Sequence, residues 1–259
     1  MMQVEQNVVF GMGGGRDLSC DIYRPATPNG AGMLLLHAGS WRRGDKTSMA
    51  GQAGMLTAEG YTCVASEYRL VPESPWPAQL HDVKAALRWF RAHAASLQVE
   101  TDQIGVLGNS AGGHLGLMLA GTPGVAAFAG EGGHGEMAEH IAALVAFYPA
   151  TLLYVDEPCP GGIPADGLFT EPPTEAEVRA ACPMTYACPE FPPTFMLHGT
   201  ADEMVPWMAS LRMYEALMAQ GAPVELHLQA GRPHAYATRD PEIIEPAMAE
   251  AVGFLKRFL

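Results

Sequence analysis

The chain has 259 residues, of which 48% are hydrophobic and 17% charged, a composition typical of a globular protein. Its formal net charge of −13 excludes the broad basic surface that nucleic acids and anionic membranes require, and it favours a neutral substrate over an acidic one. No apolar run approaches the length of a membrane span, and Met1–Phe10 lacks the features of a signal peptide. We therefore expect a cytoplasmic protein without a nucleic-acid or membrane partner, of undetermined oligomeric state.

The predicted elements begin with two strands, Val4–Phe10 and Leu18–Tyr23, joined by the turn Gly11–Asp17. The turn contains three consecutive glycines, and since no helix follows them they indicate a hairpin rather than a nucleotide-binding loop. Short apolar stretches further along are typical of parallel strands covered on both faces. These stretches are Met33–Leu36, Thr62–Ser66, Ile104–Leu107, Ile141–Tyr148, Thr194–Leu197 and Val224–Leu228.

Helical patterns separate these strands. Pro77 stands near the first turn of a helix whose apolar positions recur with a period of 3.6 residues from Leu80 to Ala94. Three further helices are expected over Gly113–Ala120, Trp207–Ala219 and Ile243–Phe258. Alternating strands and helices with short links predict an α/β fold, a mostly parallel twisted sheet with helices on both faces, begun by an antiparallel hairpin.

The alternation breaks between Thr151 and Pro193, where nine of 43 residues are proline and only Glu171–Arg179 indicates a helix. A long irregular segment inside a compact domain is usually functional. This one is expected to lie over the carboxyl edge of the sheet, where ligands bind in open α/β folds. We therefore predict a single domain over residues 1–259, with 151–193 as a cap or lid insertion.

Five cysteines are present, an odd number without metal-site spacing. Cys63 lies in an apolar stretch and is expected to be a small core residue. Cys159, Cys182 and Cys188 fall in the irregular segment, and the sequence leaves open whether two of them form a disulfide. The pattern favours reduced thiols and predicts no metal site.

The clearest chemical motif is Gly108-Asn109-Ser110-Ala111-Gly112, which follows one predicted strand and precedes a helix. A G-x-S-x-G sequence in this context is typical of a serine nucleophile on a sharp strand-to-helix turn. The small flanking residues permit the strained backbone, and the helix N-terminus favours developing negative charge. Ser110 is therefore the predicted nucleophile.

A serine hydroxyl needs a base, usually a histidine that is oriented by a carboxylate. Asp202 and His234 follow the last two predicted strands, so both reach the same sheet edge as Ser110, in the chain order Ser, Asp, His. Of nine histidines, His234 alone is late enough and at a strand end. His198 is expected to brace the loop but to lie too close to Asp202 to be its partner.

Two alternatives for the acid remain open at this point. Glu203, directly beside Asp202, is a rival carboxylate, and Asp202 itself has the residue type of a cap for the helix that is expected near Pro206.

An oxyanion hole needs backbone N–H donors aimed at the tetrahedral intermediate. Ala111, directly after the nucleophile, supplies one. Gly39 and Ser40, which leave the first parallel strand, are the expected source of the others, because glycine allows close approach of the backbone to the substrate.

Four blocks of the sequence carry a family resemblance: His37–Trp41 with Gly44-Asp45-Lys46, Tyr68-Arg69-Leu70 with Pro77-Ala78, Gly108–His114 with Leu115, and His198–Asp202 with Val205-Pro206. Together they resemble the α/β-hydrolase esterase/lipase group that includes hormone-sensitive-lipase-like and acetyl-xylan or feruloyl esterases. The resemblance implies an α/β-hydrolase fold. It also implies that Ser110, Asp202 and His234 are the nucleophile, acid and base, and that Gly39, Ser40 and Ala111 form the oxyanion hole. Two positions depart from the family pattern, Ala38 in place of the first glycine of H-G-G and Asn109 before the serine.

The expected activity is that of a serine carboxylester hydrolase that cleaves small acetyl-type or feruloyl-type esters, carbohydrate esters included, without a cofactor. Trp41, Trp207 and Tyr236 adjoin site residues and are candidates for stacking on a sugar or aromatic acid. Three alternatives stay open: an amidase such as an aryl-formamidase, an acyltransferase, and a non-catalytic binding protein on the same scaffold.

Overall fold

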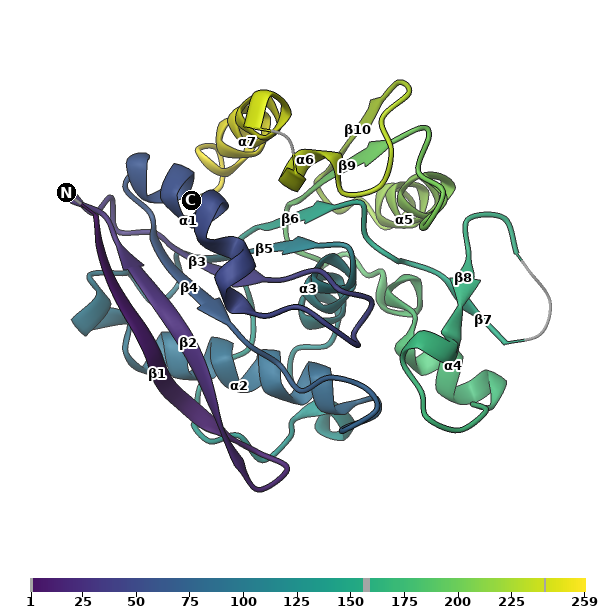
Figure 1. Ribbon diagram of the computed structural model, residues 1–259, viewed down its shortest axis with the longest axis horizontal. Helices are drawn as coiled ribbons and strands as arrows, with labels where there is room; N and C mark the ends of the chain where they lie inside the picture. The colour runs from purple at the N-terminus through teal and green to yellow at the C-terminus, as the bar shows by residue number, and fades with distance from the viewer. Residues whose placement is uncertain (1, 156–158, 240) are drawn as a thin grey trace.

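The computed structural model describes residues 2–155, 159–239 and 241–259. Its centre is a sheet of eight strands in the order β1-β2-β4-β3-β5-β6-β9-β10 (Figure 1). The first two pairings, β1 with β2 and β2 with β4, are antiparallel, and all the others are parallel. The strands are β1 (Gln3–Gly13), β2 (Arg16–Arg24), β3 (Gly32–Leu36), β4 (Thr62–Ser66), β5 (Ile104–Asn109), β6 (Leu144–Phe147), β9 (Thr194–Gly199) and β10 (Val224–Gln229).

Helices cover both faces of this sheet. Alternate residues of β3 enter opposite cores, Leu34 and Leu36 on one side and Met33 and Leu35 on the other, as the two-residue period of a strand requires. The first core also contains residues of α2, α3 and α5, and the second contains residues of α1 and α7. The prediction of a mostly parallel α/β sheet is confirmed. The helices are α1 (Ala50–Ala58), α2 (Ala78–Ala92), α3 (Ala111–Gly121), α5 (Met208–Ala219), α6 (Tyr236–Arg239) and α7 (Pro241–Leu255).

Some predicted boundaries differ from the structure. The hairpin turn is only Gly14 and Gly15, whose φ angles of +59° and +80° match the positive values that a tight two-residue turn needs. Strand β6 is shorter than predicted and ends before Tyr148, which has a φ of +40°. Helix α1 has no counterpart among the predicted elements. Its two glycines weaken its intrinsic propensity, so packing of its buried face must stabilise it.

The described part of the 151–193 segment contains little regular structure. Strand β7 (Leu153–Tyr154) pairs with β8 (Ile163–Pro164), and α4 (Glu175–Ala181) begins at a capping box formed by Thr174 and Glu177. The predicted helix over Glu171–Arg179 thus starts four residues late, because Pro172 and Pro173 precede the cap. Leu153, Val178 and Ala181 belong to the same core as α3, beside which the segment lies in Figure 1.

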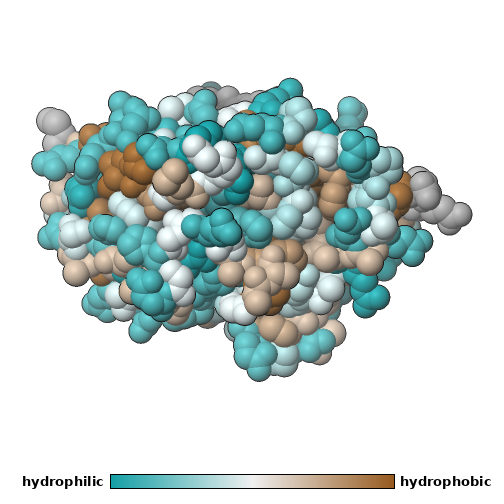
Figure 2. All heavy atoms as spheres, turned by 90° about the horizontal axis from the view of Figure 1, so that it is seen from below, coloured by the Kyte–Doolittle hydropathy of each residue, from teal (hydrophilic) through white to brown (hydrophobic). Residues whose placement is uncertain are grey.

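The surface is largely hydrophilic on the face shown in Figure 2, where the hydrophobic residues form several separate areas. Over the described ranges, no helix combines the length and apolarity needed to cross a membrane.

A buried ion cluster ties α2 to the loop before β6. The Lys84 side chain is 0% exposed, and its Nζ lies 2.6 Å from Glu139, which also pairs with Arg88 at 2.6 Å. Replacing one member of a buried pair leaves its partners uncompensated, at a cost of about 3–5 kcal/mol. We therefore expect Glu139→Gln to lower the free energy of unfolding by about that amount in urea titrations.

The matched control is Glu136→Gln, since the Glu136 side chain is 66% exposed in the same loop. It is expected to change the free energy of unfolding by less than about 0.5 kcal/mol. Equal losses in the two variants would show that the buried cluster contributes no more than a surface charge.

Candidate active site

Ser110 occupies a strained turn between β5 and α3. Its φ and ψ are +53° and −113°, values rare for any residue other than glycine, and its amide donates to the carbonyl of Phe147 at 2.8 Å. The flanking glycines are sterically required. A Cβ on Gly108 would overlap the carbonyl of Gly112, and a Cβ on Gly112 would overlap the carbonyl of Leu36. The sequence therefore folds into an elbow that presents Ser110 at the carboxyl end of β5.

Three predicted residues converge at this edge of the sheet. His234, after β10, has its Nε2 3.0 Å from Ser110 Oγ and its Nδ1 2.6 Å from Oδ2 of Asp202, which follows β9. Because a carboxylate only accepts hydrogen bonds, Nδ1 carries the proton and Nε2 is free to accept from the serine. This arrangement can remove a proton from Ser110 and keep the imidazolium beside a negative charge.

The Asp202 side chain is fully buried and saturated with donors. Its Oδ1 accepts from the backbone N–H groups of Met204 at 2.9 Å and Val205 at 2.8 Å, in a turn that precedes α5. Burial acts to raise the pKa of Asp202, but the hydrogen bonds from His198 and His234 outweigh it and hold that pKa well below its usual range. Asp202 is therefore a carboxylate. The rival Glu203 is exposed.

His234 rather than His198 bridges Asp202 and Ser110, as expected, but His198 also contacts Asp202, so closeness in sequence does not keep the two side chains apart. A turn after β9, with the Asp202 amide donating to Gly199 at 3.3 Å, folds the carboxylate back beside it. Nε2 of His198 lies 3.1 Å from Asp202 Oδ2 and 2.9 Å from the Val205 carbonyl, so it carries a proton. The Ser210 hydroxyl, 2.7 Å from Nδ1, holds the ring from the other side. His198 therefore braces the loop as expected, and it does so through direct contacts with Asp202 and Val205.

The predicted donor loop, which we define as residues 37–45, leaves β3 in an unusual conformation. Gly39, Ser40 and Trp41 have consecutive positive φ angles of +134°, +54° and +60°. The loop abuts the elbow, since Gly112 packs on the carbonyl of Leu36 where the loop begins. Within the described ranges, no protein acceptor takes a hydrogen bond from the amides of Gly39, Ser40 or Ala111. These donors remain available to an oxyanion.

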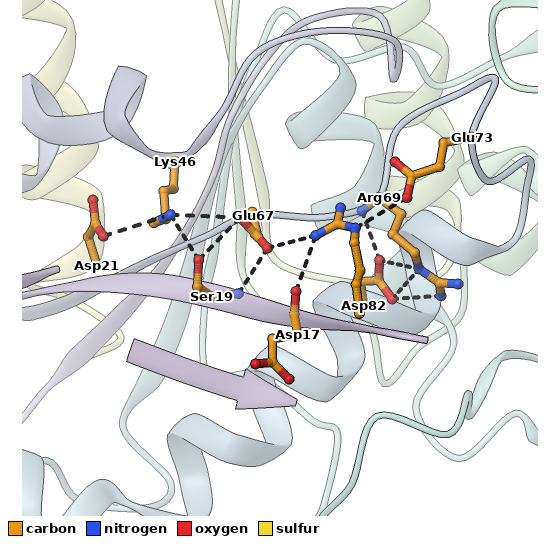
Figure 3. Close-up of polar contacts among 9 residues, drawn as sticks. Asp17, Ser19, Asp21, Lys46, Glu67, Arg69, Glu73 and Asp82 are labelled. Carbon is orange, nitrogen blue, oxygen red and sulfur yellow. Dashed lines mark hydrogen bonds and ion pairs between the residues drawn. The ribbon is translucent and has the colours of Figure 1, made fainter. Parts of the chain in front are cut away.

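A polar network anchors the far end of the donor loop (Figure 3). Lys46 follows the loop in a short 3-10 turn, and its side chain is only 9% exposed. Its Nζ donates to Ser19 Oγ at 2.9 Å and pairs with Glu67 at 3.7 Å and Asp21 at 4.0 Å. Gly44-Asp45-Lys46 is part of one of the blocks that carry the family resemblance, but nothing in the sequence indicates that Lys46 anchors the donor loop.

The aromatic residues named as substrate contacts are placed differently. Trp41 is 3% exposed and Tyr236 4%, so both belong to the core and present no face on which a substrate could stack. Trp207, just before α5, is half-buried. Adjacency to a site residue in sequence does not determine where a side chain points, and the stacking prediction for Trp41 and Tyr236 is therefore corrected.

Candidate metal ligands do not gather in the part of the chain that the structure describes, where no group of three or more His, Cys, Asp or Glu side chains could hold an ion. All five cysteines lie in that part and are free thiols. Burial raises the pKa of Cys63 above its ordinary value, as the core position predicted for it requires.

The fold and this site define an α/β-hydrolase. Comparisons with known proteins agree: the BD-FAE family model matches residues 20–217. Because that match covers most of the sequence, the chain belongs to the BD-FAE family.

Curated relatives and solved structures extend the comparison. The chain is 34% identical over 182 residues to the probable carboxylic ester hydrolase LipM of Mycobacterium tuberculosis, covering 67% of this chain and 42% of LipM. It is 29% identical over 265 residues to esterase LipQ of the same organism, covering 93% of this chain and 59% of LipQ. The chain thus spans about half the length of these relatives. The propionate-bound esterase Est2 of Thermogutta terrifontis superposes with a TM-score of 0.83 at 25% identity, covering 98% of this chain and 94% of Est2.

Proposed function

We propose that this chain is a serine carboxylester hydrolase. The observation that carries the proposal is the hydrogen-bonded series from Ser110 through His234 to Asp202, with links of 3.0 Å and 2.6 Å. A nucleophile, a base and an orienting carboxylate within these distances are the parts that acyl transfer requires.

In the proposed reaction, Ser110 Oγ attacks the ester carbonyl carbon and its proton passes to Nε2 of His234. The negative charge on the former carbonyl oxygen is held by the amides of the donor loop and of Ala111, each such donor typically worth about 3 kcal/mol. The protonated His234 then gives its proton to the departing alcohol, which leaves an acyl-enzyme. His234 next activates water, which releases the acid and restores Ser110.

For the substrate we propose a small acyl ester of the acetyl or feruloyl type, on a small molecule or an oligosaccharide. The names of the relatives as ester hydrolases support the ester bond, and the propionate held by the Thermogutta terrifontis esterase supports a short acyl group. The net charge of −13 disfavours an acidic substrate. The half-buried Trp207 is the remaining aromatic candidate for contact with a sugar or aromatic acid.

The test is a side-by-side hydrolysis panel with Ser110→Ala as the blank. It contains p-nitrophenyl acetate, acetylated xylo-oligosaccharide, a feruloylated oligosaccharide and an N-formyl aryl amine. Ester hydrolysis that disappears in the variant supports the proposal, and the preferred ester identifies the substrate class. Faster cleavage of the amide would establish an amidase instead. No turnover of any compound, together with retained binding in both proteins, would establish a binding protein.

A further inference from the structure

The donor loop is attached to the 151–193 segment by the side chain of Arg42. This guanidinium donates to three backbone carbonyls of that segment, from Nη2 to Asp166 at 2.7 Å and to Phe169 at 3.3 Å, and from Nε to Gly167 at 3.1 Å. Charge-assisted hydrogen bonds from a rigid planar donor fix geometry better than a single contact does. Arg42 therefore holds one short stretch of the segment against the loop.

The backbone of Arg42 is part of the turn that shapes the loop. Its amide donates to the carbonyl of Gly39 at 3.1 Å, and the next carbonyl back, that of Trp41, accepts from Val71 at 2.9 Å. A displacement of Arg42 must therefore disturb Gly39, whose amide is one of the proposed oxyanion donors. The positive φ angles of this turn make it depend on such external contacts.

A second, buried connection runs through His114 on α3. The indole N–H of Trp41 donates to Nδ1 of His114 at 3.2 Å, so Nε2 carries the ring proton and donates to the carbonyl of Ala181 at 2.8 Å. The Trp41 ring also lies against Gly167, where an added Cβ would be 3.3 Å from it. Burial lowers the pKa of His114 to about 4, so the ring stays neutral and this pattern persists across the neutral range.

We propose that Arg42 is a positioning residue that couples the 151–193 segment to the oxyanion donors of the loop. It acts through the backbone of Gly39 and Ser40 and does not touch the substrate. The Trp41–His114 connection supports the same geometry from inside, since it joins the segment to α3, which begins at the third donor, Ala111. This proposal rests on the proposed hydrolase function. If Arg42 has this role, stabilisation of the oxyanion depends on the position of the 151–193 segment against the donor loop.

The test compares Arg42→Ala with Arg43→Ala, because both residues are exposed but the Arg43 side chain makes no hydrogen bond or ion pair with the described residues. Each variant removes one positive charge from the same loop.

A trifluoromethyl ketone probes the oxyanion site. Ser110 adds to the carbonyl carbon of the ketone, the serine proton passes to His234, and the backbone donors must hold the resulting oxyanion. Loss of one oxyanion donor typically costs about 100–1,000-fold in kcat. For partial displacement we expect Arg42→Ala to lower kcat and ketone affinity by about 10–100-fold each, with KM changed less than about 3-fold.

Hydrogen exchange of the amides of residues 39–41 gives a readout that needs no catalysis. Faster exchange in Arg42→Ala but not in Arg43→Ala, together with parallel losses of kcat and ketone affinity, supports the coupling. Unchanged exchange, equal effects of the two variants, or a change confined to KM would overturn it. An inactive wild-type protein would contradict the proposed hydrolase function, while the exchange data would still decide whether Arg42 fixes the loop.

Discussion

Asp202→Asn is expected to lower kcat by about 10⁴-fold without unfolding the protein, as the loss of the carboxylate does in a serine triad. The backbone N–H groups of Met204 and Val205, at 2.9 Å and 2.8 Å from Oδ1, would hold the amide oxygen of the new side chain at that position. Its NH₂ group then occupies the Oδ2 position, 2.6 Å from Nδ1 of His234. There it donates where the carboxylate accepted, which forces the proton onto Nε2 of His234 and removes the base that Ser110 needs.

The comparison variant is Glu203→Gln, which changes the neighbouring, exposed carboxylate in the same way. It is expected to stay within about 2-fold of the wild type, because Glu203 makes no hydrogen bond or ion pair with any described residue. The measurement is initial-rate kinetics with p-nitrophenyl acetate, together with thermal unfolding of each variant. A loss of less than about 10-fold for Asp202→Asn, or a larger loss for Glu203→Gln, would remove Asp202 from the proposed triad.

Much of the fold and the relative positions of the site residues could be predicted from the sequence. Short apolar runs such as Met33–Leu36 have no polar face, so they must be covered on both sides, and this requires a parallel sheet between helices. Parallel strands end at one common edge. Residues that follow different strands, such as Ser110, Asp202 and His234, are therefore brought together by topology alone, although more than 120 residues separate the serine from the histidine.

The details that sequence reasoning missed depend on side-chain direction and tertiary packing. His198 reaches Asp202 because a turn reverses the chain within four residues, which strand-and-helix patterns do not encode. Trp41 is a stacking candidate by its place next to Ser40, but its ring lies in the core and its indole N–H donates to His114. Helix α1 is stabilised by contacts of Ala53 and Leu56 rather than by its own propensity. None of these features leaves a periodic signal.

Two helix glycines, Gly112 and Gly54, have opposite surroundings, and replacing them with alanine is expected to change stability in opposite directions. A Cβ on Gly112 would overlap the carbonyl oxygens of Leu36 and His37, backbone atoms at the end of β3 that cannot rotate away. A Cβ on Gly54, in α1, meets nothing within 4 Å. Alanine is favoured over glycine in a helix interior by about 1 kcal/mol, so Gly54→Ala is expected to raise the free energy of unfolding by up to that amount.

Gly112→Ala is expected to lower the free energy of unfolding by more than about 4 kcal/mol, an exceptionally large effect for one substitution, because α3 must separate from β3 to admit the methyl group. That separation would also move Ala111 away from the donor loop, so any folded fraction should be nearly inactive. Urea titrations of both variants measure the two effects. A free energy of unfolding for Gly112→Ala within about 0.5 kcal/mol of the wild-type value would show that the elbow and the donor loop are not in contact. Their amides could then not bind the same oxyanion.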